Sequence, residues 1–135
     1  MSSDWIEVPR SQSRERALEL LYEADRKERS VDIVVTDQAA PIDEYTQVLL
    51  DAVKTFTARR EELIDKNSTS WPIDRLAVLD RLILVLALSE LQMDEHPPKA
   101  VVMNEAVELA KTFCSDESPS FVNGVLSACV KELEG

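Results

Sequence analysis

The seven residues Leu-Ile-Leu-Val-Leu-Ala-Leu at positions 82–88 decide the fold of this 135-residue chain. A helix that is apolar on every side belongs at the centre of a molecule, because no face of it can meet water without cost. The run is far shorter than the ~20 residues needed to cross a bilayer. The stretch from Ile73 to Met93 is therefore predicted to form the central helix of a globular protein.

The segments around this helix carry apolar residues at a period of 3.6, which predicts amphipathic helices. The chain has two glycines, one of them its last residue, and this composition opposes a turn-rich β fold. We expect an all-α bundle, with a flexible tail over residues 1–10 and a single domain over 11–135. The predicted helices run from Ser11 or Ser13 to Arg29, from Pro41 through Ile64, from Lys99 to Phe113 and onward from a cap at Ser118, with Ser30 to Ala40 as a connection.

The charge balance limits how such a chain could meet a nucleic acid. Fifteen basic and twenty-six acidic residues give a net charge of −11, so general surface charge cannot attract RNA or DNA. A local patch is required, and Arg10, Arg14 and Arg16 offer one, because guanidinium groups suit phosphates and can stack on unpaired bases. The alternative is that these are solvated charges paired with Glu15 and Glu19 at helical spacing.

The residues that carry catalysis or bind metals are scarce. His96 lies in a turn between Glu95 and two prolines, and Cys114 and Cys129 are too few for a zinc site, so both are expected to be reduced core cysteines. We expect no enzyme activity, no metal and no cofactor. The N-terminus lacks the pattern of a signal peptide, which favours a cytoplasmic protein. Carboxylates along the central segment are expected to form ion pairs at the helix surface: Asp74, Asp80 and Glu90, with Arg75 and Arg81.

Phe121 stands in the first turn of the last predicted helix, next to the apolar stripe that begins at Val122. An aromatic residue at a helix start usually packs into the core. If it were exposed, it would offer a stacking platform for an unpaired base. Both interpretations stay open on the sequence.

Several motifs resemble those of the NusB family. They are Arg14-Glu-Arg-Ala-Leu-Glu-Leu-Leu-Tyr22, Asp80-Arg-Leu-Ile-Leu with Glu90-Leu91, Asn104-Glu-Ala-Val-Glu-Leu-Ala-Lys111 and Phe121-Val-Asn-Gly-Val-Leu126. The resemblance implies two packed helical subdomains around a central apolar helix, without catalysis. It also implies binding of boxA-type RNA together with NusE, a small-subunit ribosomal protein, in an RNA polymerase antitermination complex that acts notably on ribosomal RNA operons.

The resemblance assigns roles to individual positions. It implies RNA contacts at Arg10, Arg14, Arg16, Glu117 and Phe121, and NusE contacts at Tyr22 and Asp80. On this interpretation the arginine-bearing start and the segment around Phe121 meet to form one surface for unpaired nucleotides.

Three alternatives remain. The chain could be the NusB-like accessory domain of an RNA cytosine methyltransferase. It could instead be a module that binds only proteins, with the arginines merely solvated. A homodimer that buries the RNA-binding face is the third.

Overall fold

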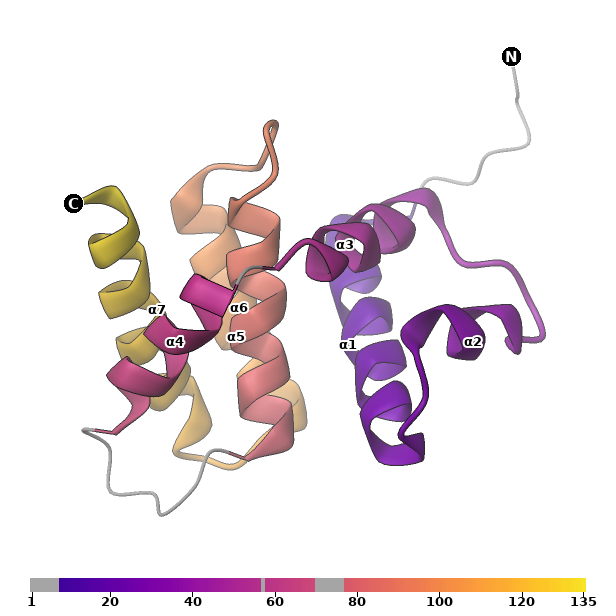
Figure 1. The fold of residues 1–135 in the computed structure, drawn as a ribbon, viewed down its shortest axis with the longest axis horizontal. Helices are drawn as coiled ribbons and strands as arrows, with labels where there is room; N and C mark the ends of the chain where they lie inside the picture. Colours follow the sequence, from indigo (N-terminus) through magenta and orange to yellow (C-terminus); the bar gives the residue numbers. More distant parts are fainter. Residues whose placement is uncertain (1–7, 57, 70–76) are drawn as a thin grey trace.

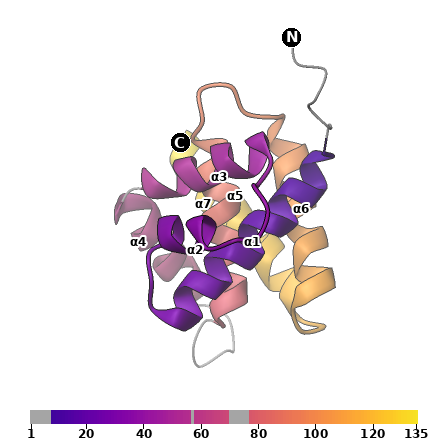
Figure 2. The same ribbon diagram turned by 90° about the vertical axis from the view of Figure 1, so that its right-hand side faces the viewer.

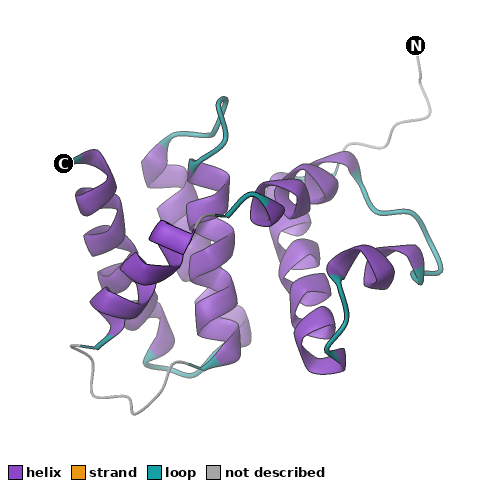
Figure 3. Ribbon diagram, in the orientation of Figure 1, coloured by secondary structure: helices purple, strands orange, loops and turns teal. Residues whose placement is uncertain are grey.

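The computed structural model describes residues 8–56, 58–69 and 77–135, and all regular elements within these ranges are helices (Figure 3). The all-α expectation is confirmed. The helices are α1 (Arg10–Lys27), α2 (Val31–Thr36), α3 (Glu44–Lys54), α4 (Ala58–Ser68), α5 (Val78–Leu91), α6 (Lys99–Phe113) and α7 (Ser118–Glu134). They form two groups, α1–α3 and α4–α7, which lie side by side in Figure 1.

The predicted central helix is α5, which packs against α1, α3, α4, α6 and α7. All eight residues from Ile83 to Glu90 are buried, so this part of the helix has no apolar face left for water. Burial of each large apolar side chain contributes about 1.5–3 kcal/mol relative to exposure. Helix α5 thus belongs to the second group and forms the surface on which α1 and α3 of the first group rest (Figure 1).

Two predicted segments have different boundaries in the structure. The connection after α1 contains the short helix α2, whose start is capped by Ser30, and a helix of six residues is too short to show a clear period. The long helix expected from Pro41 through Ile64 is two helices, α3 and α4. The first of them begins after Asp43, whose carboxylate accepts the backbone N–H of Thr46 at 3.1 Å.

Two of the serines predicted to cap helices, Ser13 and Ser118, are themselves residues of those helices. Helix α1 begins at Arg10, directly after Pro9, and Ser13 is buried within it, where its hydroxyl donates to the Asp43 carboxylate at 2.6 Å. Helix α7 begins at Ser118 itself, whose hydroxyl lies 3.1 Å from that of Ser115. Arg10 is thus part of the folded body rather than of the tail.

Figure 2 faces the α1–α3 group and shows α1 crossing in front of α5, with its first turn beside α6. This crossing brings the arginine-bearing start of α1 against the second group of helices. Across the three described ranges, no helix has the length and apolar character that a bilayer span requires. The predictions that concern Trp5, Trp71, Asp74 and Arg75 lie outside the described residues.

Candidate nucleic-acid interface

Arg14 is the best-anchored of the three arginines. Its Nε and Nη2 donate to the two carboxylate oxygens of Glu90 at 2.8 and 2.7 Å, and its Nη1 donates to Glu105 at 3.0 Å. Arg14 is 5% exposed and Glu90 1%. Burial alone would lower the pKa of Arg14, but the hydrogen bonds and the charge of Glu90 outweigh it and raise that pKa. The bidentate pair with Glu90 joins α1 to α5, and the bond to Glu105 joins α1 to α6. Both cross the boundary between the two groups of helices.

The expectation of surface ion pairs along the central helix is wrong for Glu90 and Asp80, whereas Arg81 forms such a pair with a residue of another helix. Glu90 is buried and paired with Arg14, and Asp80 is buried with 4% of its surface exposed. Arg81 pairs with Asp65 of α4 at 2.6 Å. The reason is position: α5 is surrounded by other helices, so its carboxylates meet side chains from those helices rather than their sequence neighbours.

Tyr45, at the second position of α3, contacts Arg10, the first residue of α1, through the face of its ring. The Cζ of Arg10 lies 4.4 Å from the centre of the Tyr45 ring, and that of Arg14 lies 5.9 Å away. The Tyr45 hydroxyl donates to Glu90. Burial and the neighbouring Glu90 raise the pKa of Tyr45 to about 12, against the opposing effect of the two guanidinium groups. Tyr45 therefore stays neutral, and its hydroxyl keeps its proton and donates it in the hydrogen bond to Glu90.

Arg16 points to another side of α1. On a helix of 3.6 residues per turn, positions 10 and 14 share a face and position 16 does not. Arg16 donates to Gln38, in the segment after α2, and pairs with Glu19 at 3.5 Å. The pairing with Glu19 is the one that the sequence-based alternative expects, and the predicted RNA contact at Arg16 stays a prediction. The three arginines therefore do not form one continuous patch.

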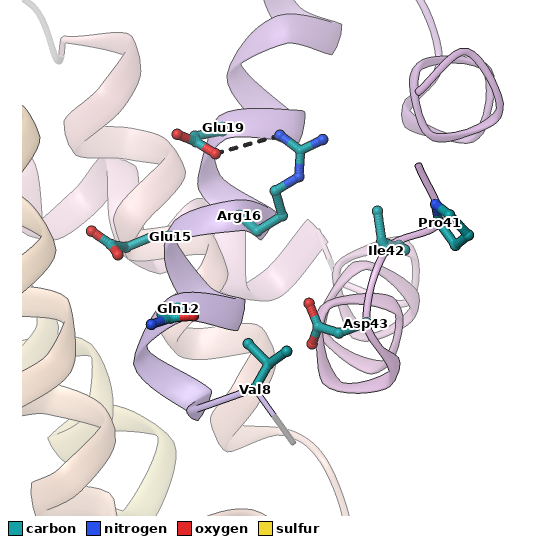
Figure 4. A pocket seen from close by; sticks show the side chains of 8 residues that line it. All are labelled: Val8, Gln12, Glu15, Arg16, Glu19, Pro41, Ile42 and Asp43. Atoms are coloured by element: carbon teal, nitrogen blue, oxygen red, sulfur yellow. Dashed lines mark hydrogen bonds and ion pairs between the residues drawn. The ribbon is translucent and has the colours of Figure 1, made fainter. Parts of the chain in front are cut away.

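A hollow of about 450 Å³ lies beside Arg16, between α1 and the segment that leads into α3 (Figure 4). Its lining consists of Val8, Gln12, Glu15, Arg16, Glu19, Pro41, Ile42 and Asp43. Three carboxylates against one guanidinium make the hollow acidic. Burial alone would raise the pKa of Asp43, but the hydrogen bonds from Ser13 and Thr46 outweigh it and lower that pKa, so Asp43 stays ionised. Such a lining repels phosphate.

Phe121 is buried, with 1% of its surface exposed. It precedes Val125 by one helical turn, and both side chains belong to the wide buried face of α7. The structure therefore supports the packing interpretation of Phe121 and offers no exposed ring for a base to stack on. Glu117, directly before α7, is exposed.

The two stretches expected to meet lie apart. Arg14 reaches Glu105 in the middle of α6, whereas α7 begins beyond the end of α6 at Phe113, about 12 Å further along at 1.5 Å per residue. In Figures 1 and 2 the start of α1 lies toward the upper end of the bundle and the start of α7 toward the lower end. A groove of about 250 Å³ lies between α1 and α6, on the side toward the end of α6. Arg14 lines it together with Glu15, Glu105 and Glu108, and these three carboxylates repel a phosphate backbone.

The residues expected to contact the protein partner differ in access. Tyr22 is half-buried on α1, with the Cζ of Arg26 5.8 Å from its ring centre. Asp80 is buried in the first turn of α5, and its Oδ1 accepts no hydrogen bond. Burial and Asp80 together raise the pKa of the Cys114 thiol to about 12. Tyr22 can meet a partner directly, whereas Asp80 lies beneath the surface.

Tyr45, Glu90 and Glu105 make up the environment of the arginines, and the sequence did not single them out for this role. Tyr45 fitted the apolar stripe of its helix, and Glu90 was placed at the surface. A cluster drawn from four helices leaves no spacing signal in the chain. Among the described residues, no three His, Cys, Asp or Glu side chains are grouped so that they could hold a metal ion.

The chain matches the family model described as NusB family over residues 11–131. It is 40% identical over 127 residues to the transcription antitermination protein NusB of Streptomyces griseus, covering 87% of this chain and 89% of that protein. It is 41% identical over 124 residues to the NusB of Saccharopolyspora erythraea, covering 87% and 83%.

Solved structures agree with the sequence comparisons. T. maritima NusB superposes with a TM-score of 0.80 at 26% identity, covering 94% of each chain. A chain from the antitermination factors NusB and NusE in complex with double-stranded RNA superposes with a TM-score of 0.73 at 28% identity, covering 91% of this chain and 96% of that one. With its central α5, its two groups of helices and these matches over nearly its whole length, the chain belongs to the NusB family.

Proposed function

We propose that this chain is a transcription antitermination factor that binds boxA-type RNA together with NusE and helps RNA polymerase to pass terminators, notably on ribosomal RNA operons. The observation that carries the proposal is the family membership. It is supported by the match over 91% of the chain to a solved structure of NusB and NusE in complex with double-stranded RNA. The role is binding rather than catalysis, and it places the protein in the cytoplasm with the nascent transcript.

The charges on α1 support a weak RNA binder that depends on its partner. Arg10 is exposed and Arg16 is partly exposed, whereas Arg14 is buried against Glu90. Each phosphate contact on a single strand contributes about 0.7 to the slope of log affinity against log salt, so two arginines give a slope near −1.4. With a net charge of −11, the rest of the chain repels RNA. NusE would supply the missing contacts and dock near Tyr22, which is accessible on α1.

The test is a titration of fluorescently labelled boxA-type RNA, followed by anisotropy, with and without NusE. We expect weak binding by this chain alone and at least tenfold tighter binding with NusE. A double-stranded RNA of the same sequence shows which form is preferred. Equal affinity with and without NusE contradicts the cooperative mechanism.

A charge-matched pair of variants separates a local contact from the effect of total charge. Arg10→Glu and Arg29→Glu each change the net charge equally and at exposed sites, but they lie at opposite ends of the first helical region. We expect Arg10→Glu to weaken RNA binding several times more than Arg29→Glu. Equal weakening would mean that RNA senses only the overall charge of the chain.

A protein-only interaction module is the second candidate. The acidic hollow beside Arg16 and the buried positions of Arg14 and Phe121 favour it, because they reduce the number of groups that RNA can reach. Stable capture of NusE by this chain without any RNA binding by the pair would support this module and refute the proposal above. The predicted RNA contact at Glu117 and the predicted partner contact at Asp80 remain predictions under either function.

A further inference from the structure

The arginines at the start of α1 differ in how many hydrogen-bond donors remain available to a ligand. Three of the five N–H donors of the Arg14 guanidinium are used, two on Glu90 and one on Glu105, and the side chain is buried. Arg10 is exposed. Its guanidinium lies over the face of the Tyr45 ring, with the Cζ atom 4.4 Å from the ring centre. A ring contact leaves the N–H donors at the edge of the guanidinium directed away from the ring and open to acceptors.

The Tyr45 ring is itself fixed from beneath. Its hydroxyl donates to Glu90, which is 1% exposed and is held in turn by two hydrogen bonds from Arg14. The chain of contacts thus runs from the buried carboxylate of α5 through the ring of α3 to the exposed guanidinium of α1. Each link is made by a side chain from a different helix, so the packing of the two groups of helices determines where Arg10 lies.

We propose that Tyr45 is a positioning residue for RNA binding: held by the buried Arg14–Glu90 pair, it presents Arg10 to a phosphate of the RNA, while Arg14 itself makes no contact with RNA. This inference rests on the proposed function and changes the role of Arg14 from contact to support. The physical reason is preorganisation. A long arginine that already rests on a ring loses less conformational freedom on binding than one that moves freely in water.

The size of the effect follows from the strength of an exposed contact between a cation and a ring, which corresponds to about a two- to fivefold change in affinity. Tyr45→Leu removes the ring and is expected to weaken binding of single-stranded boxA-type RNA by that factor. Tyr45→Phe keeps the ring and is expected to retain most of the affinity. In an Arg10→Ala background, Tyr45→Leu is expected to have no further effect.

A matched control lies just beyond the end of α3. Phe56 is half-buried, eleven positions after Tyr45, and Phe56→Leu makes the same kind of aromatic-to-leucine change. Phe56→Leu is expected to leave the affinity for RNA unchanged. Equal losses for Phe56→Leu and Tyr45→Leu, or a full loss for Tyr45→Leu in the Arg10→Ala background, would overturn the positioning role.

The salt dependence of binding separates contact from support for Arg14. Arg10→Ala is expected to reduce the slope of log affinity against log salt by about 0.7, the value for one phosphate contact on a single strand. The paired variant Arg14→Met/Glu90→Leu removes both buried charges together. It is expected to bind more weakly with an unchanged slope, and a slope reduced by about 0.7 would show that Arg14 contacts phosphate.

A measurement without RNA distinguishes failure of this inference from failure of the proposed function. In proton NMR of the folded chain, the side-chain methylene protons of Arg10 are expected to be shifted upfield by the Tyr45 ring. The shift is expected to persist in Tyr45→Phe and to vanish in Tyr45→Leu. Absence of the shift in the unmodified chain overturns the arrangement itself. Absence of RNA binding by the unmodified chain with NusE refutes the proposed function, and with it the role of this arrangement in RNA binding.

Discussion

Replacing Glu90 by glutamine tests the buried ionic cluster that joins the two groups of helices. Glu90 accepts two hydrogen bonds from Arg14 and one from the hydroxyl of Tyr45, and it is 1% exposed. Glutamine keeps the shape of the side chain but removes the charge. Its amide NH₂ group, a hydrogen-bond donor, then faces the N–H and O–H donors of Arg14 and Tyr45. The Arg14 guanidinium then stays buried with Glu105, which is 23% exposed, as its remaining carboxylate.

The magnitude follows from the cost of leaving a buried charge without its partner. Breaking a buried ion pair from one side costs about 3–5 kcal/mol. Because Glu105 and one oxygen of the new amide still accept hydrogen bonds, we place Glu90→Gln at the lower end, about 3 kcal/mol. For a chain of this length, that corresponds to a fall in Tm of about 10–15 °C.

The assay is thermal and urea unfolding followed by circular dichroism at neutral pH. The matched control is Glu23→Gln, which breaks an exposed pair with Lys27 of 2.8 Å and is expected to leave Tm nearly unchanged. The paired variant Arg14→Met/Glu90→Leu leaves neither buried charge without its partner, since Glu105, which loses Arg14, is 23% exposed, and it is expected to be more stable than Glu90→Gln. A Tm for Glu90→Gln as close to the unmodified chain as that of the control would refute the reasoning.

The remaining predictions concern pH and packing. The pKa of Asp43 is lowered in the folded state, so its contribution is present above the ordinary pKa of about 4 and is lost as pH falls through the folded value. Asp43→Ala is expected to cost about 1–2 kcal/mol in urea unfolding at pH 7 and progressively less below pH 4; a constant cost would exclude this linkage. The pKa of Tyr45 is raised to about 12, so its contribution is present below the unfolded value of about 10 and is lost as pH rises toward 12. Between pH 9 and pH 11, the Tm of Tyr45→Phe is expected to fall less than that of the unmodified chain. Equal falls in Tm would contradict a contribution from the titration of Tyr45. Leu84→Ala, at a site with 0% exposure, is expected to cost about 2–5 kcal/mol in urea unfolding, whereas Val78→Ala, at 44% exposure, costs less than about 0.5 kcal/mol; similar costs would mean that α5 is not the centre of the core.

Much of the architecture was predictable from local patterns. The run from Leu82 to Leu88 predicted the central helix, and α6 has the predicted bounds, Lys99–Phe113. Helical periodicity reports which face of a segment is apolar, and this signal survives without knowledge of the fold. Short elements were harder, because the six residues of α2 are fewer than two turns and the break between α3 and α4 carries no proline or glycine.

The candidate site was less predictable, and the reason is geometric. The sequence shows three arginines near one another, but it cannot show that Arg14 turns inward to Glu90 while Arg16 turns outward to Gln38. In the same way, the sequence left both a buried and an exposed Phe121 open, and only the orientation of α7 shows that it is buried.

The amino-acid sequence by itself determined the helical class, the central position of α5 and the family, because these depend on periodicity and on motifs read along the chain. The tertiary structure alone decided which charges are available to a ligand. Burial and partner choice depend on side chains from distant helices. The carboxylate of Glu90, 76 positions from Arg14 in the chain, holds in the interior a guanidinium that the sequence alone would place at the surface.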